Sequence, residues 1–344
     1  MSVEVRLLQA GEETAWDDYV MAHPQGSPFH LLAWKLVIEE VYGWEPIYLT
    51  VREDDRLRSV LPLFLVSTLV TGRILLSTPF AVYGGALSDS ETALAALAEE
   101  VRRRASQLGV QYVELRNAWP EQRMGFAPVT RYVTFTQEIG PNAEAMLEAI
   151  PRKTRYMVRK ALKHPFSTRV TRDRGGFESL YLSNLRKLGT PAFSRKHFEA
   201  IERHFGEQMD VREVVLNGEL TAAVLSFYFR NQVLPYYGAS DPAYNEYAPN
   251  NYMYFDLMRW GGENGYRLFD FGRSKMQGSG SFDFKAHWGM AVRELPYEVL
   301  LVKRKELPNF SPNNERLRKV IALWQKVPLA VANRIGPHLV RMFP

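Results

Sequence analysis

The chain has 344 residues, a length that favours two domains over one, and its 46% hydrophobic content is ordinary for a globular protein. It contains no Cys, which excludes disulfides, thiol catalysis, Cys-ligated zinc sites and iron–sulfur clusters. The formal net charge of +5 is modest, so the distribution of basic residues is more informative than their total. Because no apolar run reaches the length of a membrane span and the charged start is unlike a secretory signal, we expect a cytoplasmic protein without a transmembrane helix.

The first half of the chain alternates helix and strand patterns. Apolar side chains at helical spacing predict a helix over residues 29–44, and Pro28 suits its start. The other predicted elements are strands at 47–51, 57–65 and 73–76, a break at Tyr83-Gly84-Gly85, a helix at 90–108 and a strand at 110–115.

The second half repeats this order. Asn217-Gly218, a strong hairpin signal, separates strands predicted at 211–216 and 220–229. A strand at 232–237, a break at Gly238, a helix at 250–263 and a strand at 268–271 follow. We therefore predict a duplicated α/β protein with mostly antiparallel sheets flanked by helices, and chance similarity of two α/β halves is the alternative. The predicted domains are 1–150 and 151–308, with a helical tail at 309–344.

A basic segment at residues 151–176 separates the two halves. Arg155 and Arg159 fall on one helical face within it, while Met157 and Val158 belong to an apolar face. A solvated linker is the ordinary interpretation of such a charge run. A helix that packs through its apolar side instead holds its charges in a fixed place, which suits an anion such as phosphate.

The stretch from residue 266 to 289 has the most unusual polar pattern in the chain. A buried strand is expected at 268–271, with Asp270 among apolar residues and Gly272 at its end. The cationic, glycine-broken loop expected after it contains Arg273, Lys275, Gly278 and Gly280, and Phe284-Lys285 comes next. Functional groups are common in loops at strand ends, although a glycine turn with a solvated Arg and Lys has the same pattern.

Common catalytic motifs are absent from the sequence. The His residues show no metal-ligand spacing, no G-x-S-x-G elbow or P-loop occurs, and the Q-G-S-G-S segment around Gly278 opens no recognisable helix. The polar groups that remain at predicted strand ends are Asp270, Arg273, Lys275 and Lys285, with Tyr236, Tyr237 and Tyr252 near them in the pattern. Such a set suits acyl transfer, because a cation stabilises the oxyanion and a carboxylate or phenol accepts the nucleophile's proton.

The tail predicts two amphipathic helices divided by Pro328. Leu323, Trp324 and Val327 supply its apolar character, and basic residues such as Lys326 lie between them. A membrane-surface helix pair has this pattern. A C-terminal helix docked on the body of the protein has it too, and is the more common case.

Two ordered motifs resemble a known family. K-T-R-Y-M-V-R-K-A at 153–161, and Y-R-L-F-D-F-G-R-S followed by F-K-A-H-W-G, resemble segments of the FemAB-like (peptidoglycan interpeptide-bridge) aminoacyltransferases. The likeness is strongest to the FemAB-like proteins of PEP-CTERM/exosortase and exopolysaccharide systems. It implies two tandem GNAT-like (acetyltransferase-type) domains that transfer an acyl or aminoacyl group, with aminoacyl-tRNA as the donor in some branches.

The resemblance also implies roles for individual residues. It implies that Lys285, after Phe284, stabilises the transition state and that Arg155 and Arg159 grip the acceptor's phosphates. Tyr252 or Tyr254 is implied to line the substrate channel. We expect Asp270 to orient Lys285 or Arg273, and the other residues expected to shape the site are Arg273, Lys275 and Tyr237.

The chain departs from the family at identifiable places. Arg116-Asn117 stands where members often have Asp-Pro, which affects the first domain's part of the acceptor site. The absence of a long coiled-coil insertion argues against tRNA as the donor. The absence of a [QR]-x-x-G-x-[GA] motif after a strand argues against coenzyme A.

Together these patterns predict an acyl or aminoacyl transferase without a tightly bound cofactor or metal. Its acceptor is expected to be anionic and phosphate-bearing, linked to a sugar or lipid in envelope or exopolysaccharide assembly at the inner face of the membrane. The donor is expected to be aminoacyl-tRNA or acyl-CoA. A coenzyme A-dependent GNAT N-acetyltransferase and a non-catalytic protein docked on a membrane by its tail are the alternatives.

Overall fold

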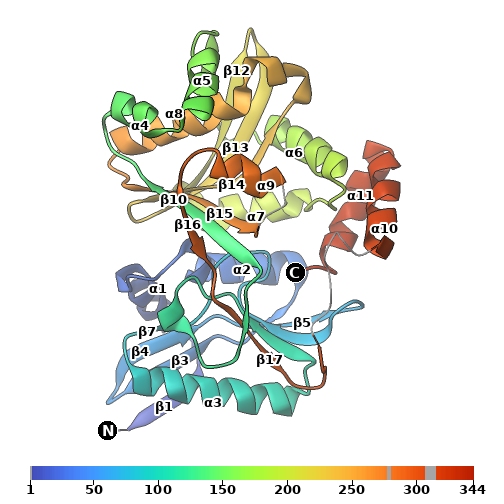
Figure 1. Ribbon diagram of the computed structural model, residues 1–344. Coiled ribbons are helices and arrows are strands. Elements are labelled where there is room, and N and C mark those ends of the chain that lie inside the picture. Colours follow the sequence, from blue (N-terminus) through green and yellow to red (C-terminus); the bar gives the residue numbers. More distant parts are fainter. Residues whose placement is uncertain (1, 277–279, 307–314) are drawn as a thin grey trace.

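The computed structural model describes residues 2–276, 280–306 and 315–344. Its two halves are stacked, with the N-terminal half at the bottom of Figure 1 and the second half above it. The predicted boundary between residues 308 and 309, and Gly278 of the glycine-rich segment, lie outside the described residues.

The lower half contains two sheets. Their strand orders are β1-β3-β4-β7 and β2-β5-β6-β8-β17-β9. The strands are β1 (Val3–Leu7), β2 (Glu45–Pro46), β3 (Leu49–Glu53), β4 (Arg56–Leu61), β5 (Phe64–Thr68), β6 (Gly72–Leu76), β7 (Leu87–Ser88), β8 (Tyr112–Leu115), β9 (Ala127–Val129) and β17 (Tyr297–Leu301). The helices of this half are α1 (Glu13–Ala22), α2 (Leu32–Tyr42) and α3 (Glu91–Leu108).

The upper half is built on one sheet with strand order β11-β12-β13-β14-β15-β10-β16. The strands are β10 (Tyr132–Glu138), β11 (Phe166–Thr171), β12 (Met209–Leu216), β13 (Glu219–Phe229), β14 (Gln232–Ser240), β15 (Leu268–Lys275) and β16 (Ala291–Glu294). The helices are α4 (Ala143–Ala149), α5 (Arg152–Ala161), α6 (Gly175–Leu188), α7 (Arg195–Phe205), α8 (Pro249–Glu263) and α9 (Gly280–Ala286). The tail forms α10 (Glu315–Lys326) and α11 (Leu329–Val340).

The duplication predicted from the order of elements is visible in the sheets. Each half contains one short parallel pair, and the two strands then separate: Leu75 and Leu76 of β6 pair with β8, and Gln232 and Val233 of β14 pair with β15. The other strand pairs are antiparallel. In both halves, therefore, two neighbouring parallel strands pair over two residues and then separate.

The strands cross the boundary predicted at residue 150. β10 lies before it in sequence but pairs with β15 in the upper sheet. β17 lies in the predicted second domain but pairs with β8 in the lower sheet. Local signals report where strands lie in the chain, whereas the choice of a sheet edge depends on distant partners. For these two strands the predicted domain division is wrong.

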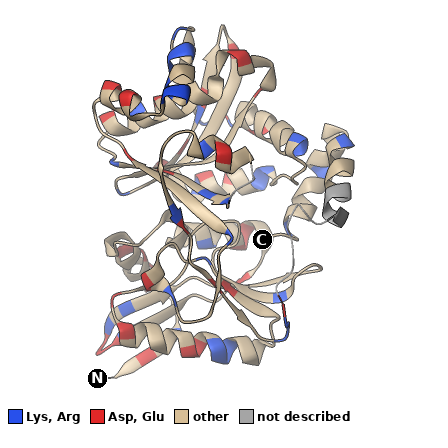
Figure 2. Cartoon of the chain, viewed as in Figure 1, with Lys and Arg blue, Asp and Glu red and all other residues tan. Residues whose placement is uncertain are grey.

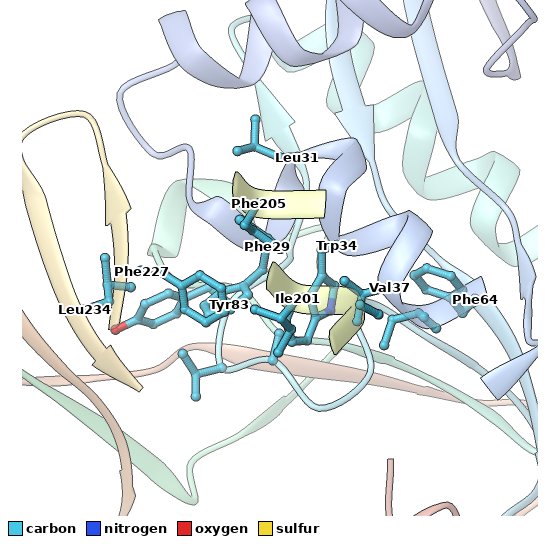
Figure 3. Packing of buried hydrophobic residues seen from close by; sticks show 14 of the residues in the cluster. Phe29, Leu31, Trp34, Val37, Phe64, Tyr83, Ile201, Phe205, Phe227 and Leu234 are labelled. Carbon is cyan, nitrogen blue, oxygen red and sulfur yellow. The ribbon is translucent and has the colours of Figure 1, made fainter. Parts of the chain in front are cut away.

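An aromatic core joins the halves. Phe29 and Trp34, from the α2 region, pack edge-to-face on Phe227 of β13, with ring centroids 5.6 and 6.2 Å apart, and Phe205 of α7 covers the same ring. Figure 3 shows these rings together with Ile201 and Leu234 of the upper half. Full burial of such side chains stabilises each by about 1.5–3 kcal/mol, so the two halves are packed against each other through a shared core.

The stretch singled out in the sequence differs from its prediction in detail. β15 does not end at Gly272 but continues to Lys275, so Arg273 lies on a strand and not in a loop. Gly272 has φ +65°, and the register shifts between Thr134 and Thr136 of β10, which makes it the site of a β-bulge. The segment after the glycine-rich run does open a helix, α9.

Glu298 of β17 stabilises the strand that the second half contributes to the lower sheet. Its fully buried carboxylate accepts from Met124 N at 2.8 Å, Phe126 N at 2.9 Å and Asn117 Nδ2 at 3.0 Å. We expect Glu298→Ala to lower the free energy of unfolding by about 3 kcal/mol, because buried N–H donors lose their acceptor. Urea unfolding measures this loss, and Glu294→Ala, at an exposed position, is the matched control. Equal stability of the two variants would contradict the stabilising role of Glu298.

Candidate functional site

The site lies at the seam between the halves and begins at the bulge in β15. Successive carbonyls of a regular strand point in opposite directions, but the left-handed conformation of Gly272 turns them together. Lys285 Nζ of α9 donates to the carbonyl oxygens of Phe271 at 2.5 Å, Gly272 at 3.0 Å and Arg273 at 3.1 Å. The three donors of this ammonium are thereby fixed beside a bulged strand.

Burial lowers the pKa of Lys285 to about 8, and the nearby Arg273 charge adds to this shift; only an ionised Asp270 carboxylate would oppose it. The side chain is therefore still mainly an ammonium at pH 7, but close to its titration midpoint. A cation held in this way suits the stabilisation of a developing oxyanion, which would replace a carbonyl as its partner.

Asp270 connects the first half to this bulge. Its Oδ1 accepts from Gly272 N at 2.7 Å and lies 3.0 Å from Thr134 Oγ1, and its Oδ2 lies 2.8 Å from the Tyr83 hydroxyl. Tyr83 and Thr134 also contact each other, with 2.5 Å between their oxygens. Tyr83 belongs to the chain break of the first half, so this buried cluster joins β10, β15 and the lower half.

The cluster favours a neutral Asp270. If all three contacts among these side chains are hydrogen bonds, they need three protons, and the two hydroxyls supply only one each. A protonated carboxyl supplies the third and closes a ring of hydrogen bonds. Burial raises the pKa of Asp270, in agreement with this count. Through these contacts Asp270 fixes Gly272 N–H and the two hydroxyls in place.

Arg273 is a half-buried cation that lies against two tyrosines. Its guanidinium lies 4.4 Å from the centroid of the Tyr132 ring, and Nη1 donates to the Tyr297 hydroxyl at 3.3 Å. The Tyr236 ring stands at the same seam, with its hydroxyl bonded to Phe80 O at 2.9 Å. No carboxylate pairs with Arg273 in the part of the chain that the structure describes. A half-buried guanidinium that meets no carboxylate among the described residues is suited to bind a substrate anion.

Arg116 brings a second buried cation to the seam from the end of β8. It donates to the backbone oxygens of Thr78 at 3.2 Å and Ala81 at 3.0 Å, and to Glu114 Oε1 at 3.1 Å. Its remaining Nη2 donates to the backbone oxygen of Pro344 in the tail at 2.7 Å. Arg116 thus holds the loop after β6 and makes a hydrogen bond to the last residue of the tail.

Tyr237 lies beside the site and contacts His197, a residue that the sequence analysis did not single out. Its hydroxyl lies 3.0 Å from His197 Nε2, and Tyr42 of α2 lies 3.2 Å from His197 Nδ1. Burial lowers the pKa of His197 to about 3, so the imidazole is neutral and connects α2, α7 and β14. The His residues have no metal-ligand spacing, and no sequence pattern predicts that His197 lies between two tyrosines from distant elements.

The other predicted site residues divide into two groups. Tyr254 and Phe284 lie in an aromatic wall behind Lys285, each against Phe271, with the Tyr254 and Phe284 ring centroids 5.7 Å apart. Tyr252 faces away, toward Phe166 O. Lys275 is exposed at the end of β15.

Arg155 and Arg159 do not join the seam cluster. Both guanidiniums pair with Glu148 of α4, on the outer side of the upper half, where α5 and its basic residues stand in Figures 1 and 2. The structure therefore brings together Asp270, Arg273, Lys285, Tyr254 and Phe284, and places Arg155 and Arg159 elsewhere, where they share the Glu148 carboxylate.

A separate cleft of about 730 Å³ runs along the outer side of α2. It is lined by leucines of β1 and α2 and by Lys35, whose ammonium pairs with Glu39 at 2.6 Å. Its lining does not include the cations of the seam. Among the described residues, no group of three His, Asp or Glu could hold a metal ion.

Comparison with known proteins identifies the fold. Residues 152–286 match the model of the acetyltransferase (GNAT) domain. The crystal structure of FemX is similar over 87% of this chain and 98% of its own, with a TM-score of 0.68 and 16% identity. L-PGS from Bacillus licheniformis is similar over 93% and 100%, with a TM-score of 0.53 and 11% identity. A search of curated proteins finds no match.

A tandem GNAT protein from the clavulanic acid biosynthesis pathway is also similar, over 89% of this chain and 100% of its own, with a TM-score of 0.52 and 12% identity. At such identities these likenesses concern the fold alone. They confirm the predicted arrangement of two tandem GNAT-like domains with helices on mixed sheets.

The neutral state of Asp270 is testable by substitution. Asn reproduces the donor and acceptor pattern of a protonated carboxyl, so we expect Asp270→Asn to change the free energy of unfolding by less than about 1 kcal/mol. Asp270→Ala leaves Gly272 N–H and the two hydroxyls short of a partner and should cost about 3 kcal/mol. Thermal and urea unfolding of both variants distinguish a neutral from an ionised Asp270. A large loss of stability in Asp270→Asn would show that the carboxylate is ionised.

The lowered pKa of Lys285 predicts a pH dependence of stability. From pH 8 upward the folded chain has released this proton, while the unfolded chain holds it until about pH 10.5, so the folded state gains stability over that range. We expect wild-type stability, relative to Lys285→Met, to rise by up to about 1.4 kcal/mol per pH unit between pH 8 and 10. Urea unfolding at each pH measures this difference. If the stabilities of wild type and Lys285→Met change in parallel with pH, the lowered pKa of Lys285 is contradicted.

Proposed function

We propose that this protein is a FemAB-like transferase that moves an acyl or aminoacyl group to an amine or hydroxyl of an anionic, carbohydrate-linked acceptor. The observation that carries the proposal is Arg273, which lies against tyrosines at the seam of a tandem GNAT-like fold and meets no carboxylate among the described residues. Arg116 is held beside the same tyrosines and adds positive potential. An acceptor phosphate would supply the missing negative charge.

The reaction follows from the groups beside this anion site. The acceptor's nitrogen or oxygen attacks the donor's carbonyl carbon and forms the new bond, and the bond from that carbon to the donor's oxygen or sulfur breaks. The Lys285 ammonium, which lies 3.1 Å from the backbone oxygen of Arg273, stabilises the oxyanion formed between these steps. The proton lost by the nucleophile leaves with the donor's oxygen or sulfur.

The proposal places the acceptor in envelope or exopolysaccharide assembly at the cytoplasmic face of the membrane. The resemblance to FemAB-like proteins of PEP-CTERM systems and the similarity in fold to FemX and L-PGS support this class. Aminoacyl-tRNA and acyl-CoA are the donors to be distinguished. Arg155 and Arg159, with Glu148 between them, are not assigned to the acceptor.

A coenzyme A-dependent GNAT N-acetyltransferase is the second candidate. The match of residues 152–286 to the acetyltransferase (GNAT) domain favours it. In that case acetyl-CoA alone would stabilise the protein, because a ligand that binds only the folded state raises its stability.

The experiment is a thermal-shift comparison of wild type, Arg273→Gln and Arg155→Ala with UDP-N-acetylglucosamine and with acetyl-CoA. At a ligand concentration 100 times Kd, binding adds about 2.7 kcal/mol of stability. We expect the nucleotide sugar to stabilise wild type and Arg155→Ala, and not Arg273→Gln. Stabilisation by acetyl-CoA alone would establish the second candidate, and an equal nucleotide-sugar shift in Arg273→Gln would refute the anion site.

A transfer assay then separates binding from chemistry. Lys285→Met should keep the nucleotide-sugar shift and lower the rate of transfer from labelled aminoacyl-tRNA or acetyl-CoA by about 10²–10³-fold, the usual effect of losing an oxyanion donor. Full activity in Lys285→Met would remove this residue from the mechanism.

A further inference from the structure

The tail is held on the upper half through one side of its helices. Ala332, Gly336 and Val340 of α11 recur every turn and are buried. A side chain at Gly336 would lie 3.1 Å from Ala192 N, so the helix approaches the body closely. Arg186 of α6 donates to Gln325 O at 3.0 Å. The tail therefore presents its other side in a fixed orientation.

That other side is apolar and exposed. Val331 and Ile335, one helical turn apart on α11, are each 43% exposed, and Leu323 of α10 is 69% exposed. Leu188, at the adjoining end of α6, is 62% exposed. We call these four side chains the tail face. Large exposed apolar side chains on three packed helices are candidates for an interaction surface.

The charges of the tail helices are mostly positive, and Glu315 at the start of α10 is their acidic residue. Segment 316–344 contains no Asp or Glu, and its basic residues are Arg316, Arg318, Lys319, Lys326, Arg334 and Arg341. Lys326 and Arg334 are exposed beside the apolar side chains, and Lys187 precedes Leu188 on α6. Figure 2 shows basic residues on these helices.

We propose that the tail face docks this protein on an anionic lipid surface. Apolar side chains on a helix that lies in the interface enter the acyl boundary, and flanking Lys and Arg are attracted to anionic headgroups. A second copy of the chain fits less well, because a symmetric contact would bring the same basic residues against each other. Within the described residues, no helix combines the length and apolar character needed to cross a bilayer, so the contact is peripheral.

The test is flotation of the full chain with vesicles of 30% phosphatidylglycerol in phosphatidylcholine, and with phosphatidylcholine alone. We expect binding to the anionic vesicles, weakened at least tenfold when salt is raised from 0.1 to 0.5 M, and little binding to neutral ones. Val331→Asp/Ile335→Asp should lower the partition coefficient at least tenfold. Val170→Asp, at a valine that is 60% exposed on the edge strand β11, is the matched control and should bind like wild type.

A second variant separates charge from apolar contact. Lys326→Glu/Arg334→Glu leaves the apolar side chains in place and should lose most of the preference for anionic vesicles. Equal flotation of wild type and both variants, or no flotation of wild type, would overturn the proposal. Light scattering that shows a wild-type dimer and a monomeric Val331→Asp/Ile335→Asp would assign the face to a second copy instead. None of these readouts depends on transfer activity.

Discussion

The structure depends on an exchange of strands between its halves. β10 leaves the first half to pair with β15, and β17 returns from the second half to pair with β8. Each exchanged strand makes backbone hydrogen bonds with the other half, and neither half can open without breaking them. The seam is therefore a rigid boundary built from both sheets, which is what a site needs when its groups must be held within fractions of an ångström.

This rigidity explains why buried cations are tolerated at the seam. A desolvated charge is costly unless hydrogen bonds or an opposite charge compensate it. Lys285 is compensated by three carbonyls of the bulge, and Arg116 by three carbonyls and Glu114. Among the described residues, Arg273 contacts a tyrosine hydroxyl and aromatic faces but no carboxylate. This difference in compensation, more than the total positive charge, is the reason why we propose Arg273 as the anion-binding position.

The sequence predicts most helices and strands, but not which distant strands pair with each other. Glycine breaks and apolar periodicity located α2, α3, α8 and most strands, and the repeated order led to the duplicated fold. Gly272 was interpreted as a strand end, because a glycine in a turn and a glycine in a bulge give the same local signal. The strand exchange was invisible, since which edge a strand pairs with depends on residues far away in the chain.

The candidate site shows the same limit. Arg155 and Arg273 are equally basic in the sequence, and only the fold reveals that Glu148 pairs with one while tyrosines lie against the other. The tyrosines themselves, Tyr132 and Tyr297, come from the two exchanged strands β10 and β17, so no local motif could have united them with β15. It follows that the strand exchange does more than fasten the halves together. By carrying one tyrosine in each direction across the boundary, it places Tyr132 and Tyr297 against the Arg273 guanidinium.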